Sequence, residues 1–238
     1  MAQAFQGSAQ SYFALLERRL SAAADPSQAD AMSAYMRHQF DFYGIKAPLR
    51  KSILQEIIRE HGLPKGDVLQ AVIRLCWQAP QREWQQLAND ILMKAKKQLT
   101  ADFMELIEWC ILHKSWWDTV DFLAGHSMAA ILSRHPKLER TEPDRWIASN
   151  NIWLQRTALL YQLFYRDQLD FERLKDYILL VADSKEFFVQ KAAGWALRQA
   201  SRLRGPEVIE FVQTHDDLLP KLTKTEALKW LEHQSKKS

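Results

Sequence analysis

An aromatic ring and a carboxylate stand four residues apart in the segment from Lys114 to Asp121. If this segment is helical, Trp117 and Asp121 project from the same face, because residues four apart are neighbours on a helix surface. A carboxylate can act in acid–base or electrostatic catalysis, and the face of an indole ring attracts cations. A second tryptophan segment, from Asn151 to Arg156, adds a guanidinium. These two segments are the candidate functional site.

Aromatic residues that begin a segment after a loop recur along the chain. Trp84, Trp117, Trp153 and Phe188 follow one another at spacings of 33, 36 and 35 residues, and a glutamine or threonine follows each by two positions: Gln86, Thr119, Gln155 and Gln190. A period in the mid-thirties with two helices per unit is typical of HEAT-like and TPR-like α-solenoids. The glycine, alanine and proline positions of the TPR consensus are missing, which favours the HEAT-like form.

The repeats predict that the unusual side chains converge. Counted from the aromatic residue of each repeat, Asp121 lies at +4, Arg156 at +3 and Trp195 at +7, which together form one helical stripe. In a solenoid the second helices of successive repeats line the concave surface, so we expect these residues to share a groove. Trp153, at the register position, is expected to anchor the core. The alternative is that Asp121 and Arg156 form a structural salt bridge.

The elements that must position this stripe are predicted to be helices throughout. The chain has only 7 glycines and 47% apolar residues, and the helical hydrophobic period recurs from Gln10 to the end. No flexible linker divides it, so we expect an all-α fold of about a dozen helices in a single HEAT-like repeat domain, residues 1–238. The breaks between helices are expected at Asp25-Pro26, Gly44 to Pro48, Gly62 to Pro64, Ala79-Pro80, His135-Pro136, Thr141 to Pro143, Gly205-Pro206 and Leu219-Pro220.

Composition excludes several classes of protein. No apolar run approaches the roughly 20 residues of a membrane span, and the N-terminus lacks the features of a signal peptide, so the cytoplasm is the expected location. Cys76 and Cys110 lie in apolar helical contexts and are expected to be buried thiols. Two cysteines cannot form a four-cysteine site, and the 7 histidines show no HExxH-type spacing, so we expect no metal and no cofactor.

The net charge of +3 does not by itself indicate nucleic acid, and the distribution of charge is more informative. Basic residues gather in three clusters, each of which could also be an ordinary solvated helix face. The clusters are Lys46/Arg50/Lys51, Lys94/Lys96/Lys97 and the stretch from Lys185 to Arg204.

Several segments together resemble the AlkD family of bacterial alkylpurine DNA glycosylases, which are HEAT-like-repeat repair enzymes. The resemblance covers most of the chain and is looser in the first 20 residues and after Gly205. The segments that carry it are Tyr35 to Arg37, Phe42 to Ile45, Leu92 to Lys97, Lys114 to Asp121, Trp146 to Ser149, Asn151 to Arg156, Ser184 to Phe188, Gln190 to Ala192 and Gly194-Trp195.

The resemblance implies hydrolysis of the N-glycosidic bond of cationic alkylated purines, such as N3-methyladenine and N7-methylguanine, in duplex DNA, without a tight base-flipping pocket. Its active-site positions fall on Trp117, Asp121, Arg156 and Trp195. Asp121 would stabilise the sugar as the bond breaks and orient water, the two tryptophans would face the cationic nucleotide, and Arg156 would hold a phosphate. The residues expected to contact the DNA backbone are Tyr35, Lys94, Lys97, Lys114, Lys185, Lys191 and Arg198.

Two other functions fit the same fold. A HEAT scaffold could bind nucleic acid without catalysis, or it could bind proteins. The resemblance favours a monofunctional glycosylase that works as a monomer on double-stranded DNA.

Overall fold

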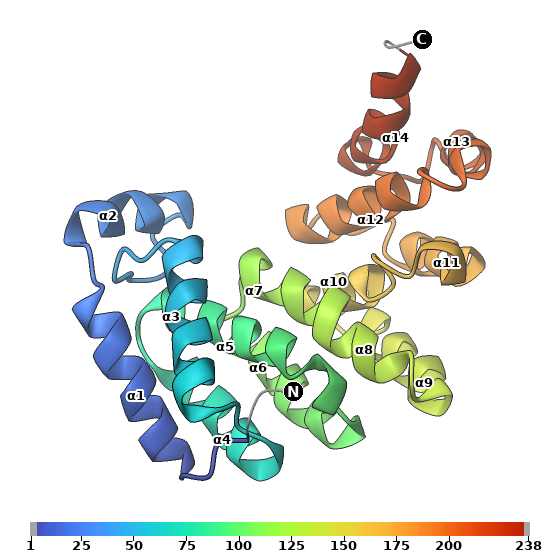
Figure 1. Ribbon diagram of the computed structural model, residues 1–238. Coiled ribbons are helices and arrows are strands. Elements are labelled where there is room, and N and C mark those ends of the chain that lie inside the picture. The colour runs from blue at the N-terminus through green and yellow to red at the C-terminus, as the bar shows by residue number, and fades with distance from the viewer. Residues whose placement is uncertain (1–3, 236–238) are drawn as a thin grey trace. The chain divides into compact units, whose positions relative to one another are not determined.

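The computed structural model describes residues 4–235, and every regular element in that range is a helix (Figure 1). Within the same range the β-type pairing is limited to an isolated parallel bridge between Ala4 and Leu63. The all-α prediction is therefore confirmed. The helices fall into two compact units, Met1–Lys114 and Ser115–Ser238, and the single domain over residues 1–238 stays a prediction.

The first unit packs its long helices around an apolar core. α1 lies against α3 and α4, and α5 lies against the same two helices. Phe13 of α1 stacks on Trp84 of α5 with ring centroids 4.5 Å apart, and Cys76 and Cys110 are buried free thiols, as predicted. The elements are α1 Ala9–Ala22, α2 Pro26–Tyr35, α3 Ala47–His61, α4 Gly66–Gln78, α5 Arg82–Lys94, the 3₁₀ turns η1 Lys96–Gln98 and η2 Ala101–Phe103, and α6 Met104–Leu112.

A buried carboxylate organises the loop between α2 and α3. Glu83 of α5 is fully buried and accepts hydrogen bonds from the backbone N–H groups of Tyr43, Gly44 and Ile45 at 2.9 to 3.0 Å. Gly44 has a φ of +88°, and a Cβ there would meet the carbonyl oxygen of Asp25 at 1.9 Å. Glycine is therefore required at the point where this loop wraps onto the carboxylate.

The second unit is built around α10 and α12. α10 contacts α7, α9 and α12, and α12 also contacts α14 (Figure 1). The elements are α7 Trp117–Phe122, the π-helical turn η3 Leu123–Met128, α8 Ala129–Leu132, α9 Pro136–Ile147, α10 Ile152–Leu160, the 3₁₀ turn η4 Arg166–Gln168, α11 Phe171–Leu180, α12 Phe187–Ala200, α13 Gly205–Thr214 and α14 Lys221–Ser235.

Most of the expected breaks coincide with helix ends. Asp25 caps α2 by accepting the N–H of Ser27, and Gly62, with a φ of +88°, ends α3. The break expected at Thr141 to Pro143 was wrong, because Pro143 lies inside α9. A proline interrupts one hydrogen bond of a helix, and the turns on either side of Pro143 continue the element across that gap.

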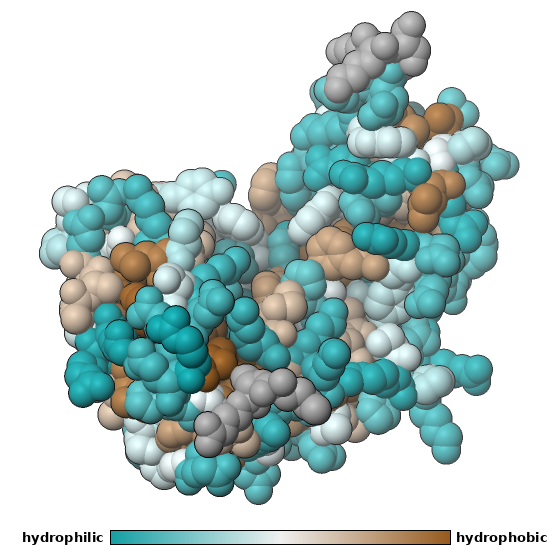
Figure 2. Space-filling model, in the orientation of Figure 1, coloured by the Kyte–Doolittle hydropathy of each residue, from teal (hydrophilic) through white to brown (hydrophobic). Residues whose placement is uncertain are grey.

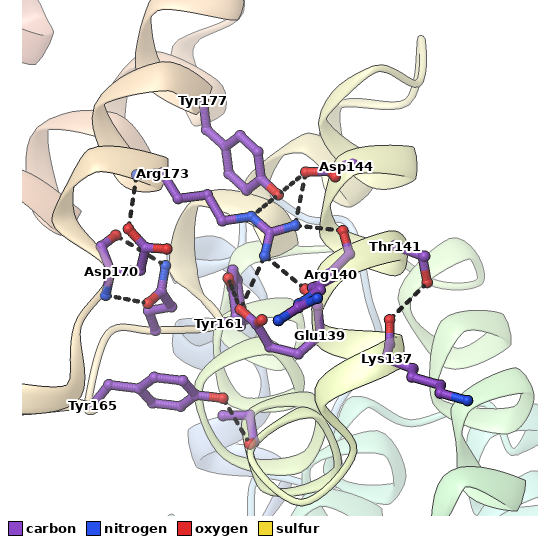
Figure 3. A network of polar contacts seen from close by, with 12 residues as sticks. Lys137, Glu139, Arg140, Thr141, Asp144, Tyr161, Tyr165, Asp170, Arg173 and Tyr177 are labelled. Carbon is purple, nitrogen blue, oxygen red and sulfur yellow. Dashed lines mark hydrogen bonds and ion pairs between the residues drawn. The ribbon is translucent and has the colours of Figure 1, made fainter.

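A polar network joins α9, the end of α10 and α11 (Figure 3). Arg173 donates to the Glu139 carbonyl oxygen at 2.9 Å and to Asp144 Oδ1 at 2.8 Å, and its Nε donates to the Tyr177 hydroxyl at 2.6 Å. The Tyr161 hydroxyl donates to Glu139 Oε1 at 2.7 Å. Each buried polar group thereby gains a partner, which offsets the cost of removing it from water.

Polar contacts between packed helices recur at a nearly constant separation along the sequence. Arg50 donates to Gln86, Arg156 to Asp121 and Lys191 to Glu226, over 36, 35 and 35 residues. Equivalent glutamines each donate to a carbonyl oxygen six residues earlier: Gln85 to Ala79, Gln155 to Ser149 and Gln190 to Ser184. The period found in the sequence therefore has a structural counterpart within each unit.

These contacts correct the register of the repeats. Alignment on the aromatic residues made Gln86 the equivalent of Gln155. The hydrogen bond that Gln85 and Gln155 have in common shows instead that Gln85 is the equivalent of Gln155. Counted from the first residue of α7 and of α10, Asp121 and Arg156 both occupy the fifth position. The aromatic residue was a less accurate marker because it lies at different distances from the helix start.

No helix within residues 4–235 combines the length and the apolar character that crossing a bilayer requires. The face seen in Figure 2 is mostly hydrophilic, with hydrophobic residues in small separate patches on each unit.

Replacing Glu83 by alanine removes the acceptor of three backbone N–H groups, so we expect the free energy of unfolding to fall by about 3 kcal/mol. Urea denaturation followed by tryptophan fluorescence measures this change. Glu17→Ala is the control, because Glu17 is exposed, and it should change stability by no more than about 0.5 kcal/mol. Equal stability of the two variants would contradict a structural role for Glu83.

Candidate functional site

The ion pair between Asp121 and Arg156 is the centre of the candidate site. Asp121 lies on α7 and Arg156 on α10, and the guanidinium grips the carboxylate with two hydrogen bonds, from Nε to Oδ1 at 2.6 Å and from Nη2 to Oδ2 at 2.8 Å. Such a bidentate arrangement fixes the plane of the carboxylate. The structure thus brings together two residues that the sequence placed on one stripe.

Arg156 also reaches a third helix. Its Nη1 donates to the carbonyl oxygen of Phe188, in the first turn of α12, at 2.6 Å. The residue is only 3% exposed, and all three guanidinium nitrogens donate to protein acceptors. We expected this guanidinium to hold a phosphate, but in this structure its hydrogen bonds are made to Asp121 and Phe188. Burial explains the difference, since a buried guanidinium needs acceptors close by.

Three aromatic rings pack together near the ion pair, and the Arg156 guanidinium carbon lies 5.9 Å from the centroid of one of them, Phe188. Trp116 lies directly before α7, Trp153 in the first turn of α10 and Phe188 in the first turn of α12. The Phe188 centroid is 5.0 Å from those of Trp116 and Trp153, and the two tryptophan rings are 6.0 Å apart. Phe187, half exposed, packs edge-on against Phe188 at 5.3 Å. These four residues are called the aromatic cluster below.

Trp153 and Trp116 differ from their expected roles. Trp153 was predicted to anchor the core, but it is half-buried in the aromatic cluster. Trp116 was not selected as a site residue, and the indole N–H of its ring is buried without an acceptor among the described residues. The recurrence of aromatic residues at successive helix starts was the signal for this cluster, but it was used to set the register of the repeats, and Trp153 was assigned to the core.

Trp117 lies on α7 with Asp121, and Trp195 lies on α12, whose Phe188 carbonyl oxygen accepts a hydrogen bond from Arg156. Trp117 is one turn before Asp121 on α7, and Trp195 is two turns after Phe188 on α12. Both side chains are half-buried, so part of each is accessible to a ligand.

The environment of Asp121 raises the pKa of its carboxyl group. Burial is the largest cause, because it disfavours the charged form, and the nearby Asp118 acts in the same direction. The hydrogen bonds and positive charge of Arg156 oppose the shift without cancelling it. Asp121 is therefore a stronger proton acceptor than an ordinary aspartate when ionised.

The four DNA-contact candidates of the first unit differ in their surroundings. Tyr35, 70% exposed, ends α2, and Lys94 and Lys97 are exposed at and after the end of α5. Lys114 instead donates from Nζ to the carbonyl oxygens of Gln78 and Ala79. Burial and the nearby Arg82 lower the pKa of its ammonium group. Lys114 thus caps α4, whose last carbonyls lack partners within the helix.

Two candidates of the second unit are paired with an acid on α14. Glu226, whose side chain is 2% exposed, accepts from Lys191 at 2.6 Å and lies 3.2 Å from Arg198. Lys229 of the same helix also contacts Glu226. The partners of Lys191 and Arg198 could not be predicted from the local charge count, because Glu226 lies about 30 residues further along the chain.

Gly194 allows this close approach of α14 to α12. A Cβ at position 194 would lie 2.5 Å from the Cβ of Glu226 and 2.7 Å from the carbonyl oxygen of Thr223. Lys185 is the remaining candidate: it is exposed and has no side-chain partner within residues 4–235.

In the part of the chain that the structure describes, no group of three His, Cys, Asp or Glu side chains is arranged to hold a metal ion. The chemistry available at the site is that of a carboxylate, a guanidinium and indole rings.

Comparison with known proteins points to one family. The family model described as DNA alkylation repair enzyme matches residues 16–231. A solved structure, described as a predicted DNA alkylation repair enzyme from Enterococcus faecalis, is 31% identical in sequence, with a TM-score of 0.80 over 87% of this chain and 96% of that one. No curated protein sequence matches the chain.

Removing the guanidinium of Arg156 leaves a half-buried carboxylate without its partner, so we expect Arg156→Ala to lower the free energy of unfolding by about 3 kcal/mol. Arg140→Ala, on an exposed residue, is the control and should change stability by at most about 0.5 kcal/mol.

The double variant Asp121→Ala/Arg156→Ala should lose less stability than the sum of the two single variants, since either single change already breaks the pair. Urea denaturation of all four proteins completes the cycle. Additive losses would mean that the ion pair does not couple the two helices.

Proposed function

Because the chain belongs to the DNA alkylation repair enzyme family, we propose that it is a monofunctional DNA glycosylase. Its substrates are cationic alkylated purines in duplex DNA, such as N3-methyladenine and N7-methylguanine, and its reaction is hydrolysis of the N-glycosidic bond. The observation that carries the proposal is the carboxylate of Asp121, held in a fixed plane by Arg156 beside an aromatic surface.

The chemistry of the substrate suits this arrangement. Alkylation at N3 or N7 makes the purine positively charged, so the base leaves as a neutral molecule and needs little acid catalysis. Positive charge develops on the deoxyribose as the bond breaks, as it does in glycoside hydrolysis. The carboxylate of Asp121 stabilises that charge and orients the water molecule that attacks C1′.

Trp117 and Trp195 contribute through their ring faces. Each attracts the cationic nucleotide by a cation–π interaction of about 0.5–2 kcal/mol. The attraction increases with the charge on the sugar, so it favours the transition state over the ground state. Their partial exposure leaves the rings accessible for this contact.

Arg156 acts as a positioning residue in this proposal. Its hydrogen bonds hold Asp121 from α10 and tie the start of α12 to the same point. The phosphate contact expected for Arg156 is assigned in this proposal to exposed cations. Lys185, just before α12, is one of them, and its exposed side chain has no partner within residues 4–235. In the first unit, Tyr35, Lys94 and Lys97 are the proposed backbone contacts.

The helices form, in our proposal, a HEAT-like α-solenoid that binds the duplex backbone as a monomer in the cytoplasm, without drawing the damaged base into a tight pocket. The polar contacts repeated every 35 or 36 residues support the repeat assignment. Binding through phosphate contacts should weaken steeply as salt rises.

A scaffold that binds nucleic acid without catalysis is the second candidate. The observation that favours it is the full engagement of Asp121 by Arg156, which a purely structural salt bridge would also show. Base release separates the two candidates.

Asp121→Asn keeps the shape of the side chain and removes its negative charge. We expect release of N7-methylguanine from duplex DNA to fall about 100-fold or more, while the dissociation constant for DNA changes little. Single-turnover base release and fluorescence anisotropy measure the two quantities. Asp118→Asn, the same substitution one turn earlier, should keep most of the activity. If the wild-type protein releases no alkylated base, the glycosylase proposal fails.

The raised pKa of Asp121 predicts the pH dependence of the reaction. The ionised form is required, so activity should fall as the pH decreases through a pKa above the ordinary aspartate value of 3.8. Rates of N7-methylguanine release between about pH 4.5 and 8, corrected for release without enzyme, give this profile. An acidic limb of the same shape in the residual activity of Asp121→Asn would assign it to another group.

A further inference from the structure

A cavity of about 250 Å³ lies in the second unit, away from the ion pair. It is formed where α10 and α12 end, together with the η4 turn and α11. The ion-pair contacts lie on α7, in the middle of α10 and in the first turn of α12, and none of Asp121, Arg156 and Phe188 lines the cavity. The proposed glycosylase reaction gives this cavity no role.

The floor of the cavity is apolar. Leu159 and Leu163 come from the end of α10 and the turn after it, Leu174 comes from α11, and all three are buried. Leu203, after α12, forms part of the wall and is 64% exposed. The volume is just below the range of about 300–1,000 Å³ that is usual for small-molecule sites, so the cavity suits one or two side chains.

The rim of the cavity is positively charged. Arg166, Arg202 and Arg204 all line it, whereas the nearby acids Asp167 and Asp170 do not. Arg204 is paired with Glu207 at 3.6 Å, but Arg166 and Arg202 have no side-chain partner within residues 4–235.

The backbone at Arg166 is itself unusual. Its φ of +58° is in the left-handed region, which a residue with a side chain seldom adopts. Strained backbone of this kind persists where the surrounding structure holds it, and it is concentrated at functional sites. Here it occurs at a residue of the rim.

We infer that this cavity binds a partner protein through a short acidic segment with one large apolar side chain. The apolar side chain fills the floor of leucines, and flanking carboxylates pair with Arg166 and Arg202, to which guanidinium groups can bind bidentately. DNA offers phosphates to the rim but no long, flexible apolar side chain for the floor. The peptide therefore provides a group for the leucine floor and for the arginine rim, whereas a phosphate provides a group for the rim alone.

The experiment is selection of a displayed library of random nonapeptides on the immobilised full-length protein. We expect enriched peptides to carry one Leu, Phe, Met or Trp flanked by at least two acidic residues. The best sequence is then synthesised with a fluorescent label, and its dissociation constant is measured by anisotropy. A copy with alanine at the apolar position should bind at least 10-fold more weakly.

Charge reversal on the rim identifies the site. Arg166→Glu/Arg202→Glu should raise the dissociation constant of the peptide at least 10-fold. The matched control is Arg18→Glu/Arg140→Glu, which makes the same change in net charge at exposed residues outside the cavity and should leave binding unchanged. Leu203→Ser, on the exposed wall, tests the apolar contact without changing the charge and should also weaken binding at least 10-fold.

Three outcomes would overturn the inference: no enrichment of peptides, enriched peptides without acidic residues, or binding that the cavity variants do not change. Rim variants that weaken binding of undamaged duplex DNA while no peptide is selected would assign the surface to DNA instead. Peptide binding needs no catalysis, so the result is independent of whether the chain releases alkylated bases.

Discussion

A buried guanidinium must find acceptors for its N–H groups, and the second unit is arranged around the way in which Arg156 does so. Its nitrogens join α7 through Asp121 and α12 through the Phe188 carbonyl oxygen, while the residue itself belongs to α10. Breaking any of these contacts would leave charge or donors in a poorly solvated place. The need to satisfy one side chain therefore fixes the relative positions of three helices, and with them the aromatic cluster and the plane of the Asp121 carboxylate.

Much of the local structure could be predicted from the sequence, because it depends on interactions between near neighbours. The scarcity of glycine and the recurring apolar spacing gave the helices, and capping or breaking residues such as Asp25 and Gly62 gave most of their ends. The repeat period predicted that Asp121 and Arg156 would lie near each other, since equivalent positions of adjacent helices are brought together. The family assignment from residue strings agrees with the family model that matches residues 16–231.

The side-chain partners that could not be predicted from the sequence are those that lie far apart along the chain. Lys191 and Arg198 belong to a stretch rich in basic residues, yet both are paired with Glu226, whose single negative charge offsets part of their positive charge. Lys114 satisfies the end of α4, and Arg156 faces a carboxylate where a phosphate contact was expected. A count of charges in a window measures composition, whereas the potential at a surface depends on which charges are left unpaired after folding. The accessible positive charge of the second unit is thus smaller than its basic stretch suggests, and it is concentrated in residues such as Lys185, Arg166 and Arg202.

The π-helical turn η3, directly after α7, sets a length constraint on this part of the chain. A π turn holds about one residue more than an α turn, and each residue advances an α-helix by about 100°. The number of residues in the turn therefore sets how the helix after it is rotated relative to the helix before it. With the present number, Asp121, before the turn, faces the site, and Ile131 and Leu132, after the turn, are buried. Deleting one residue between 123 and 128 would turn α8 by about that angle and bring other side chains to the core. Evolution can exchange residues within this turn more freely than it can change their number.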